Sequence, residues 1–274
     1  MQDTGKFRTN AKDQFYTNPR IAAQCVAMIL HTIPFAQTYH WIEPSAGNGA
    51  FLHALPPNID VTALDIEPKA ERIVQQDFLT WTPVASQEQP FLVFGNPPFG
   101  RQSSLAKAFL KHSASAVGAS VIAFILPKSF TKPSMTRAIP LHFHCKHSSD
   151  LPDNSFLLNG QPYDVPCVFQ IWVKEDTERT LDQAEEPIGF TYVKATDPHH
   201  LVIRRVGVNA GKCFFPKEAT FSPQSHYFIA FPTTTLVSAV HQHLNQHTFP
   251  SNTVGPRSVS KGEVNGVINE KTNL

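Results

Sequence analysis

The segment 91–100 constrains the fold more than any other part of this chain. Its sequence is Phe-Leu-Val-Phe-Gly-Asn-Pro-Pro-Phe-Gly, an apolar run that ends in two consecutive prolines. Proline has no N–H to donate, so two in a row cannot continue a hydrogen-bonded sheet. The sequence therefore predicts a buried strand that stops before Asn96 and a stiff loop at its carboxyl end. In open α/β sheets, ligands bind at this edge.

The loop 96–99 carries an amide, a carbonyl beside a rigid proline and an aromatic ring. These groups suit the binding and stacking of a flat ring that bears an amino group. Asn-Pro-Pro-Phe after a hydrophobic strand resembles the catalytic loop of class I S-adenosylmethionine-dependent methyltransferases that modify exocyclic amino groups, with the N6-adenine enzymes as the nearest match. A turn without catalytic function is the alternative for so short a motif, so the neighbouring segments decide between the two.

Length and composition fit one full α/β domain with a small addition. The chain has 274 residues, of which 41% are hydrophobic and 16% are charged. No apolar run reaches the length of a membrane helix and the first residues are polar, so we expect a cytoplasmic protein without a membrane partner. Four scattered cysteines form no CxxC pair, and His142, His144 and His147 lack a completing ligand set, so no metal is predicted. A net charge of +1 neither supports nor excludes a nucleic-acid partner.

A glycine-containing turn follows the first predicted strand. Residues 39–42 are expected to form that strand, residues 43–49 (Glu-Pro-Ser-Ala-Gly-Asn-Gly) the turn, and a helix is expected from Ala50. This order is typical of a nucleotide-binding βα unit, and glycine lets the backbone approach a ligand closely. The dinucleotide fingerprint G-x-G-x-x-G is incomplete, which weighs against NAD.

The turn strongly resembles the cofactor loop of the same methyltransferases. The resemblance implies S-adenosylmethionine as cofactor, with contacts from Glu43, Pro44, Ser45, Gly47 and Gly49. Glu43 would lie near the cationic methionine end. A structural turn without a ligand is the alternative.

The segment 13–20 (Asp-Gln-Phe-Tyr-Thr-Asn-Pro-Arg) precedes an amphipathic helix. Asn18 before Pro19 fits an N-cap followed by proline at the first helical position. The segment also resembles the N-terminal cofactor-binding segment of adenine methyltransferases, which implies that Tyr16 and Thr17 lie against the methionine end of the cofactor.

Acidic residues end the next two predicted strands. Asp65 closes the segment 60–66, and a carboxylate there can accept hydrogen bonds from both ribose hydroxyls, although aspartate is also common at helix N-caps. Asp77 and Phe78 end the following strand. The resemblance implies that Asp77 binds the adenine amino group of the cofactor, that Phe78 packs on its ring, and that Asn96 also contacts the cofactor.

The later segments complete the expected fold. Residues 120–126 are a continuous apolar run, typical of a central parallel strand. Two further strands within 141–150 and 165–174 flank an Asn-Gly turn. The resemblance implies a Rossmann-like class I methyltransferase domain over residues 13–175, an α/β fold with a mostly parallel seven-stranded sheet and a terminal antiparallel hairpin.

A region of different composition follows an acidic linker. We expect residues 190–248 to form a small C-terminal β-rich extension for substrate recognition. Residues 250–274 lack hydrophobic periodicity and are expected to form a flexible tail.

Four basic residues are candidate substrate contacts. Arg204, Arg205 and Lys212 lie on a predicted hairpin, where they suit phosphate contacts or base-edge recognition; a solvated hairpin fits equally well. Lys128 follows the strand 120–126 at the same sheet edge as Asn96, which is a suitable position for a phosphate, although a solvated loop fits equally well.

Together the motifs predict an enzyme that transfers a methyl group from S-adenosylmethionine to the N6 amino group of adenine in nucleic acid, with DNA slightly favoured over RNA. The predicted catalytic residues are Asn96, Pro97, Pro98 and Phe99. Methylation of adenine in RNA, of guanine N2 or of protein glutamine remains open, as does a non-catalytic cofactor-binding partner subunit. A partner subunit or a homodimer is compatible with the sequence.

Overall fold

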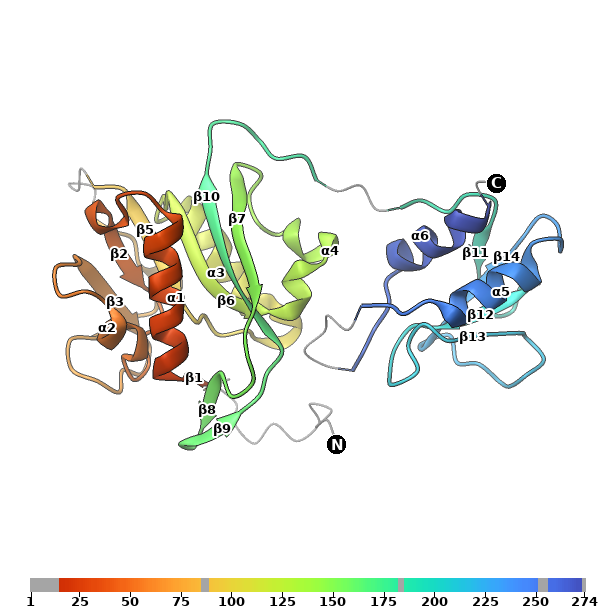
Figure 1. Cartoon of the computed structure of the whole chain (residues 1–274), viewed down its shortest axis with the longest axis horizontal. Helices are drawn as coiled ribbons and strands as arrows, with labels where there is room; N and C mark the ends of the chain where they lie inside the picture. The colour runs from red at the N-terminus through yellow and green to blue at the C-terminus, as the bar shows by residue number, and fades with distance from the viewer. Residues whose placement is uncertain (1–14, 85–88, 182–184, 251–255, 273–274) are drawn as a thin grey trace. The chain divides into compact units, whose positions relative to one another are not determined.

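The computed structural model describes residues 15–84, 89–181, 185–250 and 256–272 (Figure 1). These residues fall into two compact units, one within Phe7–Leu181 and the other within Asp182–Leu274. Residues 13 and 14 of the predicted cofactor segment lie outside the described residues, as do 251–255 and 273–274 of the predicted tail. No described helix combines the length and the apolar character that a membrane crossing needs.

The first unit is built on a seven-stranded sheet with the order β4-β3-β2-β5-β6-β10-β7. Its strands are β2 (His40–Glu43), β3 (Val61–Asp65), β4 (Val74–Gln75), β5 (Phe91–Gly95), β6 (Val121–Pro127), β7 (Phe143–Asp150) and β10 (Cys167–Lys174). Neighbouring strands from β4 to β6 pair in parallel, whereas β10 is antiparallel to both β6 and β7. The predicted Rossmann-like fold with a terminal antiparallel pair is therefore confirmed.

Helices cover both faces of this sheet (Figure 1). On one face, α1 (Pro19–Thr32) and α2 (Ala50–Ala54) pack in a core with Trp41, Leu92 and Phe94. On the other, α3 (Ser104–Ser115) and α4 (Pro133–Thr136) pack with Ile42, Val93 and Phe124. Successive side chains of a strand point to opposite faces, so the continuous apolar strands supply both cores. The single-turn helices are η1 (Ala36–Thr38), η2 (Phe78–Thr80), η3 (Arg101–Ser103) and η4 (Lys128–Thr131).

The start of α1 is fixed by the predicted cap. The Asn18 side-chain oxygen accepts a hydrogen bond from the Arg20 backbone N–H at 3.0 Å, and proline occupies the first helical turn. Just before the cap, β1 (Tyr16–Thr17) pairs with the hairpin strand β8 (Phe156–Leu158), which in turn pairs with β9 (Gln161–Tyr163). The N-terminal segment is thus held by main-chain hydrogen bonds beside the sheet.

The second unit is a four-stranded antiparallel sheet with the order β11-β14-β12-β13 and two helices. Its elements are β11 (Thr191–Val193), β12 (Leu201–Arg204), β13 (Cys213–Phe214), β14 (His226–Ala230), α5 (Val237–Gln246) and α6 (Lys261–Thr272). The predicted hairpin is the pair β12–β13. One core joins α5 and α6 to the sheet.

The expectation of a flexible tail is wrong for residues 261–272, because they form α6. Val264, Val267 and Ile268 are buried at helical spacing. The apolar pattern is interrupted by Asn265 and Asn269, which are also buried, and their amides donate hydrogen bonds to the backbone oxygens of residues 185 and 186. Because these two hydrogen-bonded asparagines occupy buried positions of the helix, the helical spacing of its apolar residues is hard to recognise in the sequence.

Candidate active site

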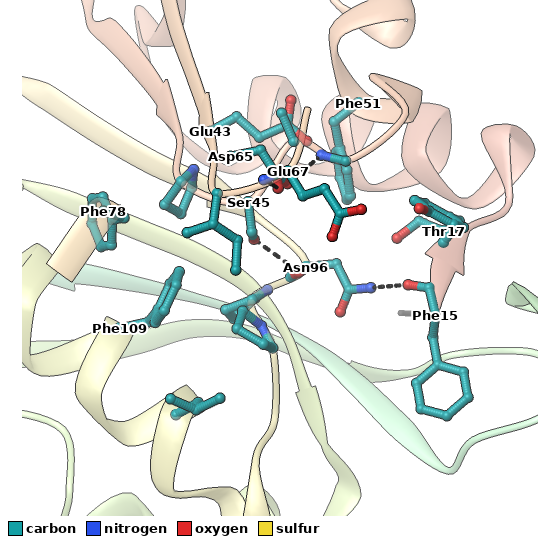
Figure 2. Close-up of a pocket in the computed structure, with 18 of the residues that line it drawn as sticks. Phe15, Thr17, Glu43, Ser45, Phe51, Asp65, Glu67, Phe78, Asn96 and Phe109 are labelled. Atoms are coloured by element: carbon teal, nitrogen blue, oxygen red, sulfur yellow. Dashed lines mark hydrogen bonds between the residues drawn. The ribbon is translucent and has the colours of Figure 1, made fainter. Parts of the chain in front are cut away.

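A cavity of about 290 Å³ lies where β2, β3 and β5 end (Figure 2). The chain proceeds from β2 to β3 on one side and returns to β5 on the other, so the cavity lies at the point where strand order reverses, the usual ligand site of such sheets. Most of the predicted cofactor-binding and catalytic residues line it: Tyr16, Thr17, Glu43, Pro44, Ser45, Gly47, Asp65, Asp77, Phe78, Asn96, Pro97, Pro98 and Phe99.

Asn96 is held in one orientation by two hydrogen bonds. Its side-chain Nδ2 donates to the backbone oxygen of Phe15 at 3.2 Å, and its own backbone oxygen accepts from Ser45 Oγ at 3.0 Å. The other side-chain atom, Oδ1, is buried and accepts no hydrogen bond from any described residue. Buried polar atoms are rarely left unpaired, so this oxygen is an acceptor available to a ligand.

Glu43 ends β2 with its side chain almost fully buried, at 1% exposure. Its Oε2 has no hydrogen-bond partner among the described residues. Burial and, secondarily, the negative charge of Asp65 raise the pKa of Glu43 well above its ordinary value. A cationic group beside Oε2 would oppose both effects, so this position favours a positively charged ligand.

Asp65 at the end of β3 orders the glycine turn. One carboxylate oxygen accepts from the Gly47 backbone N–H and the other from the Glu67 backbone N–H, each at 2.7 Å. At Gly47, where φ is +53°, a Cβ atom would lie 3.2 Å from the Tyr16 ring, so a side chain there would crowd the cavity wall. Each Asp65 oxygen retains a lone pair for a ligand hydroxyl.

The opposite wall is aromatic. Phe78 is 1% exposed and lies against Phe109 of α3, with ring centroids 5.1 Å apart. Asp77 Oδ1 accepts from the Leu79 backbone N–H at 2.9 Å and caps η2. Phe99 is also buried, at 6% exposure, and its backbone oxygen accepts from two amides of α3, including that of Leu105 at 3.2 Å. These contacts fix the Pro-Pro loop against α3.

Sequence reasoning missed several lining residues: Phe15, Ala46, Asn48, Ala50, Phe51, Ile66, Glu67, Leu79, Leu105 and Phe109. Glu67 is the most informative of these, because its carboxylate points into the cavity while pairing with Lys69 at 2.7 Å (Figure 2). Its position two residues beyond Asp65, in the bend that follows β3, is the signal that could have identified it.

The remaining predicted contacts lie outside this cavity. Gly49 is absent from its lining; with φ at +80° it occupies the N-cap of α2. Lys128 forms an ion pair with Asp150 at 2.8 Å and does not line the cavity. Arg204, Arg205 and Lys212 belong to the second unit. Across the described residues, no group of three histidine, cysteine or carboxylate side chains is placed to hold a metal ion.

No protein-family model and no curated protein matches this sequence. Among solved structures, the 23S rRNA methyltransferase ErmE aligns with 60% of this chain and 71% of its own, at 15% identity and a TM-score of 0.44. A methyltransferase subunit of a type I restriction-modification system from Streptococcus thermophilus aligns with 98% of this chain, which spans 60% of that subunit, at 16% identity and a TM-score of 0.44. Because these identities and TM-scores are low, the assignment of the fold rests on the strand order of this chain's own sheet.

Proposed function

We propose that this chain is an S-adenosylmethionine-dependent methyltransferase that acts on the N6 amino group of adenine in nucleic acid. The observation that carries the proposal is the buried Asn96 Oδ1, which lines the cavity without a hydrogen-bond donor from the described residues. Because Nδ2 is tied to Phe15, Oδ1 is the side-chain atom left for a substrate N–H.

The residues of the cavity fit the proposed cofactor. S-adenosylmethionine supplies an electrophilic methyl group on a sulfonium centre, and it carries a cationic ammonium group. Glu43 Oε2 is a buried acceptor with no partner among the described residues, and it would bind such a cation. Asp65 and Glu67 offer carboxylates for ribose hydroxyls, and Phe78 offers an apolar surface for the cofactor's adenine.

Asn96 and Pro97 would activate the substrate through hydrogen bonding. An adenine amino nitrogen is a poor nucleophile because its lone pair is delocalised into the ring. Acceptance of its two N–H bonds by Asn96 Oδ1 and the Pro97 carbonyl would localise that lone pair and direct it at the methyl group. Alignment and preorganised charge would supply most of the rate, and no strong general base is needed because the nitrogen becomes acidic after transfer.

Phe99 and the proline pair would position the base. Phe99 contributes to the cavity wall, where it would stack on the ring, and Pro98 stiffens the loop between it and Asn96. In a duplex, the base must first be flipped out of the stack. The order of the sequence motifs favours DNA slightly over RNA as the polymer. Guanine N2 and protein glutamine are the competing amino acceptors.

The proposal is tested by methyl transfer from labelled S-adenosylmethionine to DNA, RNA and a glutamine-bearing protein extract, followed by mass spectrometry of the digested products. We expect N6-methyladenine in one nucleic acid. Methylguanine or methylglutamine would replace the proposed acceptor, whereas cofactor binding without transfer to any of the three would refute the catalytic function of the isolated chain.

A further inference from the structure

The sheet of the second unit has one face that carries no helix among the described residues. Helices α5 and α6 form a single core with Leu201 and Ile203 of β12 and Ile229 of β14, so both cover the same face. Side chains alternate along a strand. Val202 and Phe228 therefore point to the opposite face.

The strand register defines the residues of this opposite face. Val202 pairs with Phe228 on one side and with Phe214 on the other, and Arg204 pairs with His226. Directly paired residues share a face of the sheet. The face is thus a row of aromatic rings across β13 and β14, with an arginine at the end of β12.

The rings of this face form a layered cluster. Val202, His226 and Phe228 form its floor, at 0%, 7% and 6% exposure. Phe221 lies over that floor, with its ring centroid 5.3 Å from Phe214 and 5.1 Å from His226. Phe214 and Phe221 are both only partly buried, so each residue retains some contact with solvent.

Two cations belong to this face. Lys212 is exposed, and its Nζ lies 5.4 Å from the centroid of the Phe214 ring. Arg204 is on the same face through its pairing with His226, and its Nε donates a hydrogen bond to the Val206 backbone oxygen at 3.1 Å. Arg205, by contrast, lies over the ring of Tyr227, which packs against the helix-covered core, at 5.5 Å. The strand positions of the helix-free face carry no carboxylate.

We propose that Lys212, Phe214, Phe221 and Arg204 form a platform that binds unpaired nucleotides. Bases would stack on the two phenylalanine rings while Lys212 and Arg204 contact phosphates. Every base has a π-face but exposes it only when unstacked, so aromatic rings beside cations favour a single strand over a duplex. The choice of nucleic acid as the occupant rests on the proposed function. The platform extends that function, because it implies that the bound part of the substrate is single-stranded.

The test is equilibrium binding of the full chain to fluorescent nucleic acid, without cofactor. The probes are an adenine-containing single strand of roughly 12 nucleotides, as DNA and as RNA, and a hairpin of the same sequence. The variants are Phe221→Ala, Phe214→Leu, which keeps an apolar side chain without a ring, and Lys212→Gln. There are two matched controls. Lys217→Gln changes an exposed lysine of the same unit, and Phe35→Ala removes the ring of a phenylalanine that is 75% exposed.

We expect the wild-type chain to prefer the single strand and each of the three platform variants to bind it about tenfold more weakly. Lys212→Gln should also make the slope of log affinity against log salt concentration shallower, by about the amount expected for one phosphate contact. Both control variants should bind as the wild type does. Any one of three results would overturn the platform: the wild type prefers the hairpin, it does not bind the single strand, or the three platform variants bind with unchanged affinity.

A parallel methyl-transfer assay separates this proposal from the proposed function. Wild-type methylation together with unchanged binding by the variants would refute the platform alone. Weakened binding by the variants without any wild-type methylation would refute the catalytic proposal and leave the platform standing.

Discussion

The Asn96 side chain donates a hydrogen bond through Nδ2 to the backbone oxygen of Phe15 at 3.2 Å. This contact joins the loop after β5 to a segment 81 residues earlier in the chain. The Phe15 ring is itself stacked on Tyr163, with centroids 5.1 Å apart, and Tyr16 pairs with Leu157. The orientation of the proposed catalytic amide therefore depends on a hairpin that does not line the cavity.

Substitution Asn96→Ala is expected to lower kcat by about 10²–10³ while leaving cofactor affinity within about threefold, because it removes an acceptor that the substrate needs in the transition state. Steady-state kinetics with the nucleic acid that the wild type methylates measure kcat. Calorimetric titration with S-adenosylmethionine measures the cofactor affinity. Asn58→Ala, at an exposed asparagine, is the control and should match the wild type. Near-normal kcat in Asn96→Ala would contradict the proposed activation.

Substitution Glu43→Gln is expected to change the pH dependence of stability. The pKa of Glu43 is raised in the folded chain. At a pH below the ordinary value of 4.5, the carboxyl is protonated in both the folded and the unfolded chain, so the free energy of unfolding is not reduced. As the pH rises, the unfolded chain releases the proton first, and the wild type loses up to about 1.4 kcal/mol of stability per pH unit until the folded pKa is passed. Glutamine mimics the neutral carboxyl and lacks this loss.

Urea denaturation between about pH 5 and pH 8 measures that difference. We expect Glu43→Gln to become progressively more stable than the wild type as the pH rises. Glu71→Gln, at an exposed glutamate, should follow the wild type at every pH. Parallel stability curves for Glu43→Gln and the wild type would show that burial does not hold the proton on Glu43.

Much of the cavity was predictable because strand ends and turn chemistry are local properties. The apolar run before Asn96 and the proline pair after it determine where β5 stops, and the Asp65 position follows from the end of β3. The order of strands was expected only through the resemblance to methyltransferases. Periodicity alone does not say which strands are neighbours.

The differences between the expected and the observed lining of the cavity have local physical causes as well. Gly49, for which a cofactor contact was predicted, does not line the cavity, and its left-handed backbone forms the N-cap of α2. Glu67 was overlooked because the direction of its side chain depends on a turn ordered by Asp65. Arg204 and Arg205 were grouped as one basic patch, although adjacent residues of an extended chain point to opposite sides.

Substitution Gly95→Ala is expected to destabilise the first unit by about 2–3 kcal/mol, through backbone strain and crowding of Glu43. Gly95 has φ at +126°, and a Cβ atom there would lie 3.3 Å from Glu43 Cγ. Gly118→Ala is the matched control, since Gly118 has φ at +71° but open space around its Cα, and it should lose only about 1 kcal/mol. Chemical denaturation compares the two. Equal losses would show that crowding of Glu43 contributes nothing.

Substitution Ile268→Ala tests whether α6 is part of the second unit's core. Ile268 is fully buried, and its truncation should lower the free energy of unfolding of this unit by about 2–4 kcal/mol through lost burial and a residual cavity. Hydrogen exchange measured by mass spectrometry should show faster exchange of the β12 amides and unchanged exchange in β6. Val208→Ala, at a valine that is 92% exposed, is the control and should leave both unchanged. If β12 protection survives Ile268→Ala, α6 does not stabilise the sheet and residues 261–272 behave as an appendage.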